Sequence, residues 1–579
     1  MNVLKRMVVV NFFILTACVT TDSGSLLENG AEVRQVQPVA QEENPAQSKE
    51  TEISPEVLFQ LLAAEIAGQR QQYGLALEGY LRASRQVKDV GVIRRAANIA
   101  LYVQDKDKLN QALALWLEAE PESLDLRYLM AIVALESGDQ QGAVGSLDFI
   151  LSHGAQDFDG KAIAMIKNLK KQQSLELAYR VFGELTIKYS DNAQLYFIRA
   201  LLDVQAKKKK QAQVNIAKAL ELDPDWVKAL LMQAQLYIAA GKLPEATDVL
   251  MRAIEAQDNT QIREQIVQLL IQQGRFEEAQ DAVQELIVDH PENHELKFKS
   301  ALIYLQTGEN KKARDILQTL VMEKTFQDKA AFYLGRMDAK EKRFDDALIW
   351  FDTIGSGPFK FDASLSAILI RMDLKRFDLA LNKIQTLKKD YPEKKTDLLL
   401  LEAELYGQKG LTQKGFDILT SALLEAPDNA RILYARALMA EKLGKLQVLE
   451  DDLKYIIEQN PNDANALNAL GYTLVDKTTR YSEAKAYLDR AIALKPSEPI
   501  ILDSYGWLLF KLKRLDESKA YLQRAYKKEP QAEIAAHLVE VLWALQKNEQ
   551  AKAILSEALA KNPDDKLLLE VQLRLLGGN

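Results

Sequence analysis

The sequence contains little of the chemistry that catalysis requires. Among 579 residues there are one cysteine, Cys18, and four histidines. A single cysteine cannot form a disulfide bond within the chain, so the fold must be held together by packing. No Gly-rich phosphate loop, no Gly-x-Ser-x-Gly elbow and no His-Glu-x-x-His metal motif occurs in the sequence. We therefore expect no enzyme activity, no catalytic residue and no cofactor.

The histidines also give no indication of a metal site. Only His290 and His294 are close together, and they flank Pro291 without a set of carboxylates at ligand spacing. The prediction for metal ligands is therefore none.

The chain has fewer basic than acidic residues. The chain has 74 lysines and arginines against 82 aspartates and glutamates, which gives a formal net charge of −8. Because a nucleic-acid backbone is itself negative, an acidic chain of this kind is a poor ligand for it. Nucleic acid is excluded as a partner.

Residues 1–17 have the organisation of a signal peptide. Two basic residues precede an apolar run, residues 7–15, which is too short to span a bilayer. The following Leu-Thr-Ala-Cys resembles the lipobox of bacterial lipoproteins, and this resemblance implies cleavage before Cys18 and acylation of that residue with fatty-acid chains such as palmitate. Since Val19 and not aspartate comes next, the resemblance also implies the periplasmic face of the outer membrane. Three acyl chains would make an effectively permanent anchor.

Residues 18–53 are predicted to be a lipidated flexible tether. They are rich in Ser, Thr, Gln, Glu and Pro and nearly free of large apolar side chains, so they cannot bury enough surface to fold. Folding is predicted to begin at Ser54 and Pro55, a capping residue followed by proline at the first helical position.

Small residues recur through the rest of the chain at a nearly constant interval. From Ala178 to Ala380 the spacings are 34, 34, 33, 34, 34 and 33 residues. The complete series is Ala76, Ala112, Ala143, Ala178, Ala212, Ala246, Ala279, Ala313, Ala347, Ala380, Gly415, Leu449, Ala484, Ser518 and Ala551. A period near 34 is typical of the tetratricopeptide repeat, or TPR, which is a pair of helices. The period is least regular between residues 85 and 190.

One unit illustrates the pattern. Leu230, Ala234 and Tyr237 lie at helical spacing, and Gly241 follows where the chain must turn. Ala246 then begins the apolar face of a second helix. The sequence thus resembles the TPR family over about nine-tenths of its length. The resemblance implies an all-α solenoid of about fifteen helix pairs, residues 54–579, wound as a right-handed superhelix.

The TPR register also predicts a binding surface. Eight aromatic residues fall at first-helix positions that face the concave groove in TPR proteins, and we expect them to bind an extended peptide or a partner helix without holding the repeats together. An alternative is that they pack into neighbouring repeats. They are Phe197, Phe298, Phe332, Tyr434, Tyr472, Trp507, Phe510 and Trp543.

Four consecutive lysines, residues 207–210, fall in a predicted turn between two helices of one repeat. The simpler interpretation is a solvated turn. The alternative is a docking point for an acidic partner.

The C-terminal third narrows the resemblance. Residues 468–475 (NALGYTLV), 499–510 (PIILDSYGWLLF) and 533–545 (EIAAHLVEVLWAL) resemble the large proteobacterial TPR lipoproteins of the LbcA type, to which the NlpI lipoprotein is similar in role. The resemblance implies an adaptor that brings substrates, such as cell-wall hydrolases, to a periplasmic carboxyl-terminal-processing protease. Two alternatives stay open: an assembly or secretion factor for pili or exopolysaccharide export, and a scaffold for cell-wall synthases.

Overall fold

The computed structural model describes residues 54–154, 157–169 and 171–577. Cys18, the predicted signal peptide (residues 1–17) and the predicted tether (residues 18–53) lie outside the described residues. The first described helix begins as the sequence predicts, because the Ser54 side chain accepts a hydrogen bond from the amide of Val57 and Pro55 is the first helical residue.

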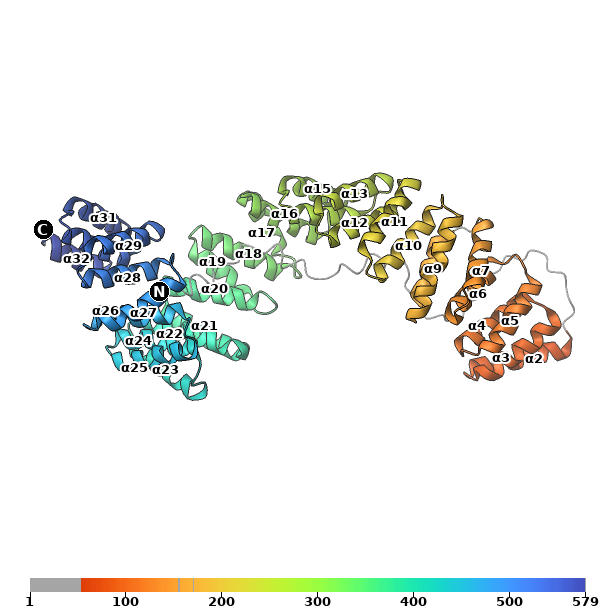
Figure 1. Cartoon of the computed structure of the whole chain (residues 1–579), viewed down its shortest axis with the longest axis horizontal. Helices are drawn as coiled ribbons and strands as arrows, with labels where there is room; N and C mark the ends of the chain where they lie inside the picture. The colour runs from red at the N-terminus through yellow and green to blue at the C-terminus, as the bar shows by residue number, and fades with distance from the viewer. Residues whose placement is uncertain (1–53, 155–156, 170, 578–579) are drawn as a thin grey trace. The chain divides into compact units, whose positions relative to one another are not determined.

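All regular structure in these described ranges is helical, and within each compact part of the chain neighbouring helices lie side by side (Figure 1). Thirty-one α-helices form fifteen pairs and one final single helix, so the predicted all-α repeat fold is confirmed. The pairs are α2 (Pro55–Gln69) and α3 (Tyr73–Val87), α4 (Val90–Tyr102) and α5 (Lys106–Ala119), α6 (Leu124–Ser137) and α7 (Gln140–Ser152), α8 (Phe158–Asn168) and α9 (Gln172–Lys188), α10 (Ala193–Gln205) and α11 (Lys209–Leu222), α12 (Val227–Ala239) and α13 (Leu243–Ala256), α14 (Thr260–Gln272) and α15 (Phe276–Asp289), α16 (His294–Thr307) and α17 (Asn310–Leu320), α18 (Gln327–Lys340) and α19 (Phe344–Thr353), α20 (Lys360–Asp373) and α21 (Phe377–Asp390), α22 (Lys395–Gln408, after the 3-10 turn η2, Pro392–Lys394) and α23 (Thr412–Glu425), α24 (Ala430–Lys442) and α25 (Leu446–Gln459), α26 (Ala464–Lys477) and α27 (Tyr481–Leu494), α28 (Pro499–Lys511) and α29 (Leu515–Lys528), and α30 (Ala532–Ala544) and α31 (Asn548–Lys561), followed by α32 (Lys566–Leu576).

The recurring small residue lies where the two helices of a pair meet. Every alanine of the series is fully buried, and even the exception Leu449 is only 1% exposed. At Gly415 an added Cβ would come within 2.9 Å of the Ala403 carbonyl oxygen. The series therefore marks the closest approach of neighbouring helices, as the spacing predicts.

The turn within a pair requires a left-handed residue. All six glycines that the repeat register places there have positive φ, with φ 73° at Gly241. In other repeats the same conformation falls on a glutamine or a lysine, among them Lys207 (φ 58°) and Lys342 (φ 61°). A side chain at positive φ is strained relative to glycine.

The irregular region contains a short helix. α8 spans only 11 residues, whereas α9 spans 17 and is longer than the 14-residue second helices that follow it. The first turns of α9 are therefore an addition that the later second helices lack.

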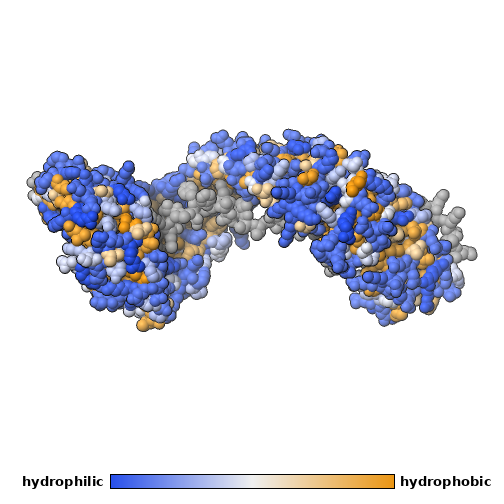
Figure 2. Space-filling model, viewed as in Figure 1, coloured by the Kyte–Doolittle hydropathy of each residue, from blue (hydrophilic) through white to orange (hydrophobic). Residues whose placement is uncertain are grey.

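The chain divides into two compact units, residues 1–316 and 317–579. In each unit the apolar core runs along the helix pairs, while hydrophilic residues cover most of the visible surface (Figure 2). Among the described helices, none is both long and apolar enough to cross a membrane.

Candidate partner-binding site

Four of the eight predicted groove aromatics are buried. The exposed fractions of Phe197, Phe298, Phe332 and Trp507 are 1, 2, 6 and 5%. Phe197 packs on Trp226 with ring centroids 4.7 Å apart, and Phe332 lies 5.0 Å from the ring of Phe359. The prediction that these four side chains line an open groove is therefore corrected, because neighbouring repeats cover them.

The other four, Tyr434, Tyr472, Phe510 and Trp543, are half-buried. The structure brings only part of the set together. Trp507 stacks on Phe510 with ring centroids 5.0 Å apart. The His537 ring lies against both Trp507 and Tyr472 and so connects Tyr472 to this pair. Tyr434 and Trp543 lie on the flanking helices α24 and α30.

The first helices of the last repeats form one continuous surface. α26 packs on α28 and α28 packs on α30. Aromatic and acidic side chains gather on these helices and on α24. We call this group the C-terminal cluster, and its members are Glu441, Tyr472, Asp476, Asp503, Trp507, Glu533 and His537.

A buried ion pair lies at the base of the C-terminal cluster. His537 is 4% exposed, and its Nδ1 lies 3.0 Å from both carboxylate oxygens of Asp503. Burial lowers the pKa of His537, but the Asp503 carboxylate and its hydrogen bond outweigh burial and, with Glu533 and Glu540 nearby, raise the pKa above its ordinary value. The indole of Trp507 stacks on this imidazole with centroids 4.1 Å apart.

Glu441 brings to the C-terminal cluster a carboxylate without a direct partner. No hydrogen bond or ion pair joins its half-buried carboxylate to another of the described residues. Burial raises the pKa of Glu441, Lys477 opposes this rise, and the carboxylates of Glu533 and Asp476 add to it. A cation placed against Glu441 would remove this repulsion.

The tyrosines of the site are held in their neutral form. Burial, with Asp463 and Glu441 nearby, raises the pKa of Tyr434 to about 12. Burial and the neighbouring Glu533 raise the pKa of Tyr472 well above its ordinary value, and the Tyr472 hydroxyl donates a hydrogen bond of 2.7 Å to Glu533.

The sequence reading missed His537, Asp503, Glu533 and Glu441. A signal was present for two of them, because Asp503 and His537 are separated by 34 residues, one repeat length. Residues one period apart occupy equivalent positions on adjacent first helices, so their side chains meet.

Two side chains of this region that could take part in chemistry are already engaged. Trp507 covers His537, and the nearby Ser504 hydroxyl donates a hydrogen bond to the carbonyl oxygen of Ile500. In the ranges that the structure describes, no three His, Cys, Asp or Glu side chains are placed to hold a metal ion.

These features define a helical-repeat protein, and comparison with known sequences agrees. One family profile, described as "Tetratricopeptide repeat", matches residues 270–334 and 509–575. A second profile with the same description matches residues 474–533. The chain belongs to the family of TPR repeat-containing proteins that includes PA4667 of Pseudomonas aeruginosa. The two share 32% identity over 512 residues, which cover 87% of this chain and 85% of that relative.

Solved structures that match this chain include two complexes. One is Naa15/Naa10 bound to HypK-THB, with 14% identity, coverage of 69% of this chain and 68% of that one, and a TM-score of 0.36. The other is the APC/C hetero-tetramer Cut9-Hcn1, with 14% identity, coverage of 90% and 97%, and a TM-score of 0.29.

Proposed function

We propose that this protein is a non-enzymatic adaptor lipoprotein of the bacterial outer membrane. In this proposal an acylated Cys18 anchors it at the periplasmic face, and residues 18–53 tether the solenoid. The C-terminal cluster binds a protein partner. The partners are a periplasmic carboxyl-terminal-processing protease and its cell-wall hydrolase substrates.

The observation that supports partner binding most directly is the unpaired carboxylate of Glu441. It lies beside half-buried aromatic side chains on a continuous first-helix surface. Aromatic side chains contribute most of the binding energy at protein interfaces, and a desolvated unpaired charge favours a partner of opposite sign. A segment with basic and apolar residues fits both features. The identity of the partner as a protease rests on the resemblance of the C-terminal motifs and the Leu-Thr-Ala-Cys sequence.

The test is capture of partners from a detergent-solubilised cell envelope. The wild-type protein is compared with Glu441→Lys, which reverses one charge in the C-terminal cluster. The matched control is Glu458→Lys, which makes the same change at an exposed position of α25, the second helix of the same pair. We expect Glu441→Lys to lose its partners and Glu458→Lys to retain them.

Mass spectrometry of the captured proteins then decides the class of adaptor. A processing protease together with wall hydrolases supports the proposal. Secretin or glycan-export subunits would indicate an assembly factor, and cell-wall synthases alone would indicate a scaffold. Equal capture by both variants would show that the C-terminal cluster is not the binding surface.

A further inference from the structure

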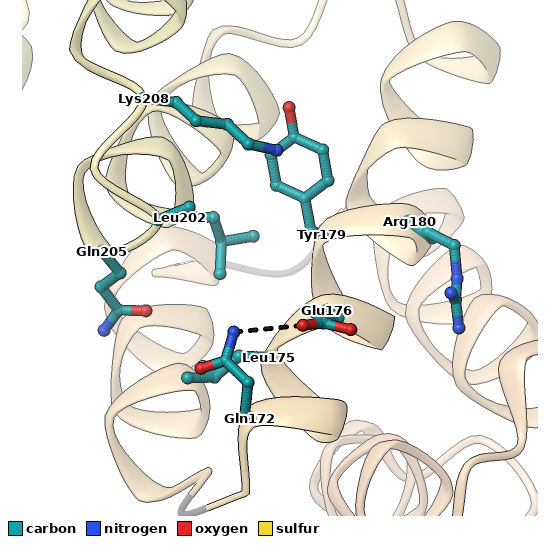
Figure 3. Close-up of a pocket in the computed structure, with 9 residues that line it drawn as sticks. Gln172, Leu175, Glu176, Tyr179, Arg180, Leu202, Gln205 and Lys208 are labelled. Carbon is teal, nitrogen blue, oxygen red and sulfur yellow. Dashed lines mark hydrogen bonds between the residues drawn. The ribbon is translucent and has the colours of Figure 1, made fainter.

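Lysines 207–210, which span the turn after α10 and the first residues of α11, lie beside a cavity in the N-terminal unit. The cavity has a volume of about 280 Å³ and lies between α9 and α10. Its lining includes the aliphatic side chains of Leu175 and Leu202, the ring of Tyr179 and the amide side chains of Gln172 and Gln205 (Figure 3). A cavity of this size has room for an apolar side chain.

A lysine is placed at the edge of this cavity. The Lys208 side chain reaches over the Tyr179 ring (Figure 3), and its ammonium lies 4.2 Å from the ring centroid. Glu176 is the one acidic residue of the lining, and it accepts a hydrogen bond from Gln172. Arg180 lies at the rim with its guanidinium turned away from Lys208.

The positive charge around this cavity is not neutralised by the protein. Lysines 207–210 are all exposed, and Arg199 lies nearby with its guanidinium carbon 5.9 Å from the Tyr179 ring. No ion pair within the described ranges joins any of these five residues to a carboxylate. This imbalance occurs in a chain whose net charge is −8.

Equivalent positions elsewhere in the array are neutralised within their own repeat more often than not, although Arg376, Lys445 and Lys547 share with Lys208 the lack of a carboxylate three residues later. Lys208 is the residue that precedes the second helix. In five other repeats the basic residue at this position pairs with a carboxylate three residues later. These pairs are Lys242 with Glu245, Arg275 with Glu278, Arg343 with Asp346, Arg480 with Glu483, and Arg514 with Glu517. Three residues after Lys208 the chain has Gln211.

We propose that this cavity and the surrounding lysines, which we call the basic pocket, bind an acidic segment of a protein partner. One apolar side chain of that segment enters between Leu175, Leu202 and Tyr179, and its carboxylates face lysines 207–210. The glutamine amides at the rim are suited to bond its backbone. This proposal concerns a different site from the C-terminal cluster and does not depend on it.

An acidic peptide fits the basic pocket better than a nucleic-acid duplex does. A nucleic-acid duplex needs a long cationic stripe, whereas these cations surround a cavity large enough for a single side chain. The opposite charge of an acidic segment also accelerates its encounter with the site.

The test measures binding of the full-length protein to a fluorescent peptide of glutamates around one leucine, by anisotropy at low and physiological salt. The control peptide has glutamine in place of each glutamate. We expect binding of the acidic peptide only, with affinity that falls as salt rises.

Two variants examine the basic pocket. Lys208→Gln removes the cation over Tyr179, and Gln211→Glu supplies the carboxylate found in five other repeats. Each should weaken binding by about fivefold, the effect of losing or screening one close charge. The matched control is Lys375→Gln, which removes an exposed lysine from the turn between α20 and α21. It should bind like the wild type, and all variants should keep their helical circular dichroism.

Three results would overturn the proposal. One is equal weakening by Lys375→Gln, which would indicate a general charge effect. Another is equal binding of the glutamine peptide. The third is binding of anionic lipid vesicles with no binding of the acidic peptide, which would assign the basic pocket to a membrane surface.

Discussion

The hydroxyl of Tyr472 donates a hydrogen bond of 2.7 Å to Glu533, although 61 residues separate them. Tyr472 belongs to α26 and Glu533 to α30, and the first helix between them, α28, packs on both. The bond therefore links first helices of alternate repeats. With Glu441 of α24, the C-terminal cluster therefore combines residues from four repeats.

Trp507 and Tyr472 should respond differently to substitution. Trp507→Ala removes a side chain that is 5% exposed and stacked on two rings, so we expect the free energy of unfolding to fall by about 3–5 kcal/mol. Tyr472→Phe keeps the ring and loses one hydrogen bond, so it should cost about 1 kcal/mol. Denaturant unfolding followed by circular dichroism measures both. Equal costs would mean that Trp507 is not part of the packing.

The buried pair of His537 and Asp503 predicts a dependence of stability on pH. The folded-state pKa of His537 is raised, so the pair adds stability that is fully present below the unfolded value of about 6.5. That stability is lost as the pH rises through the folded-state pKa. Besides Asp503, the charged groups nearest His537 are Glu533 and Glu540 of its own helix α30, and Lys511 of α28 lies over the Trp507 ring.

Comparison with Asp503→Asn isolates this effect from the other titrating groups. The difference in unfolding free energy between wild type and Asp503→Asn should shrink as the pH rises through the folded-state pKa of His537. A difference that stays constant from acidic to alkaline pH would contradict the prediction.

The ionised Glu441 side chain should lower the stability of the fold, whereas the ionised His537 side chain raises it. The pKa of Glu441 is raised, so folding favours the protonated acid, and the charged form costs stability above the folded-state pKa. Glu441→Gln should therefore make the protein more stable at neutral pH and leave it unchanged in acid, where Glu441 is already neutral. Thermal unfolding at the two pH values measures this. Destabilisation at neutral pH would show that the Glu441 carboxylate is already compensated.

Periodicity predicts some features of this protein far better than others. Backbone geometry demands a small residue such as Ala279 where helices meet and a permissive residue such as Gly241 in the turn, so these positions can be identified from the sequence. The burial of Trp507 depends on what the next repeat places opposite it, and spacing alone does not contain that information. The His537 pair differs, because its spacing of 34 residues places both side chains at equivalent positions of adjacent first helices and could have been identified from the sequence.

Ala279→Arg should separate the helices of one pair. Ala279 is fully buried in the N-terminal unit. Overpacking costs about 1–3 kcal/mol, and burying an unpaired charge adds to this. Because repeats couple only to their neighbours, thermal unfolding should become multi-step instead of shifting as one transition. A single sharp transition at the wild-type temperature would place Ala279 outside the helix contact.

Cys18→Ser tests the predicted anchor. If Cys18 is acylated, serine cannot form the thioether, so the variant should lose metabolic labelling with a fatty acid and leave the membrane fraction or accumulate as uncleaved precursor. The lysine and glutamate variants described above serve as controls, since they leave the N-terminus intact and should be labelled like the wild type. Since Cys18 is the only cysteine, no disulfide is lost in this variant, and its helical circular dichroism should be unchanged. Labelling that persists in Cys18→Ser would refute the assignment of Cys18 as the lipidated residue.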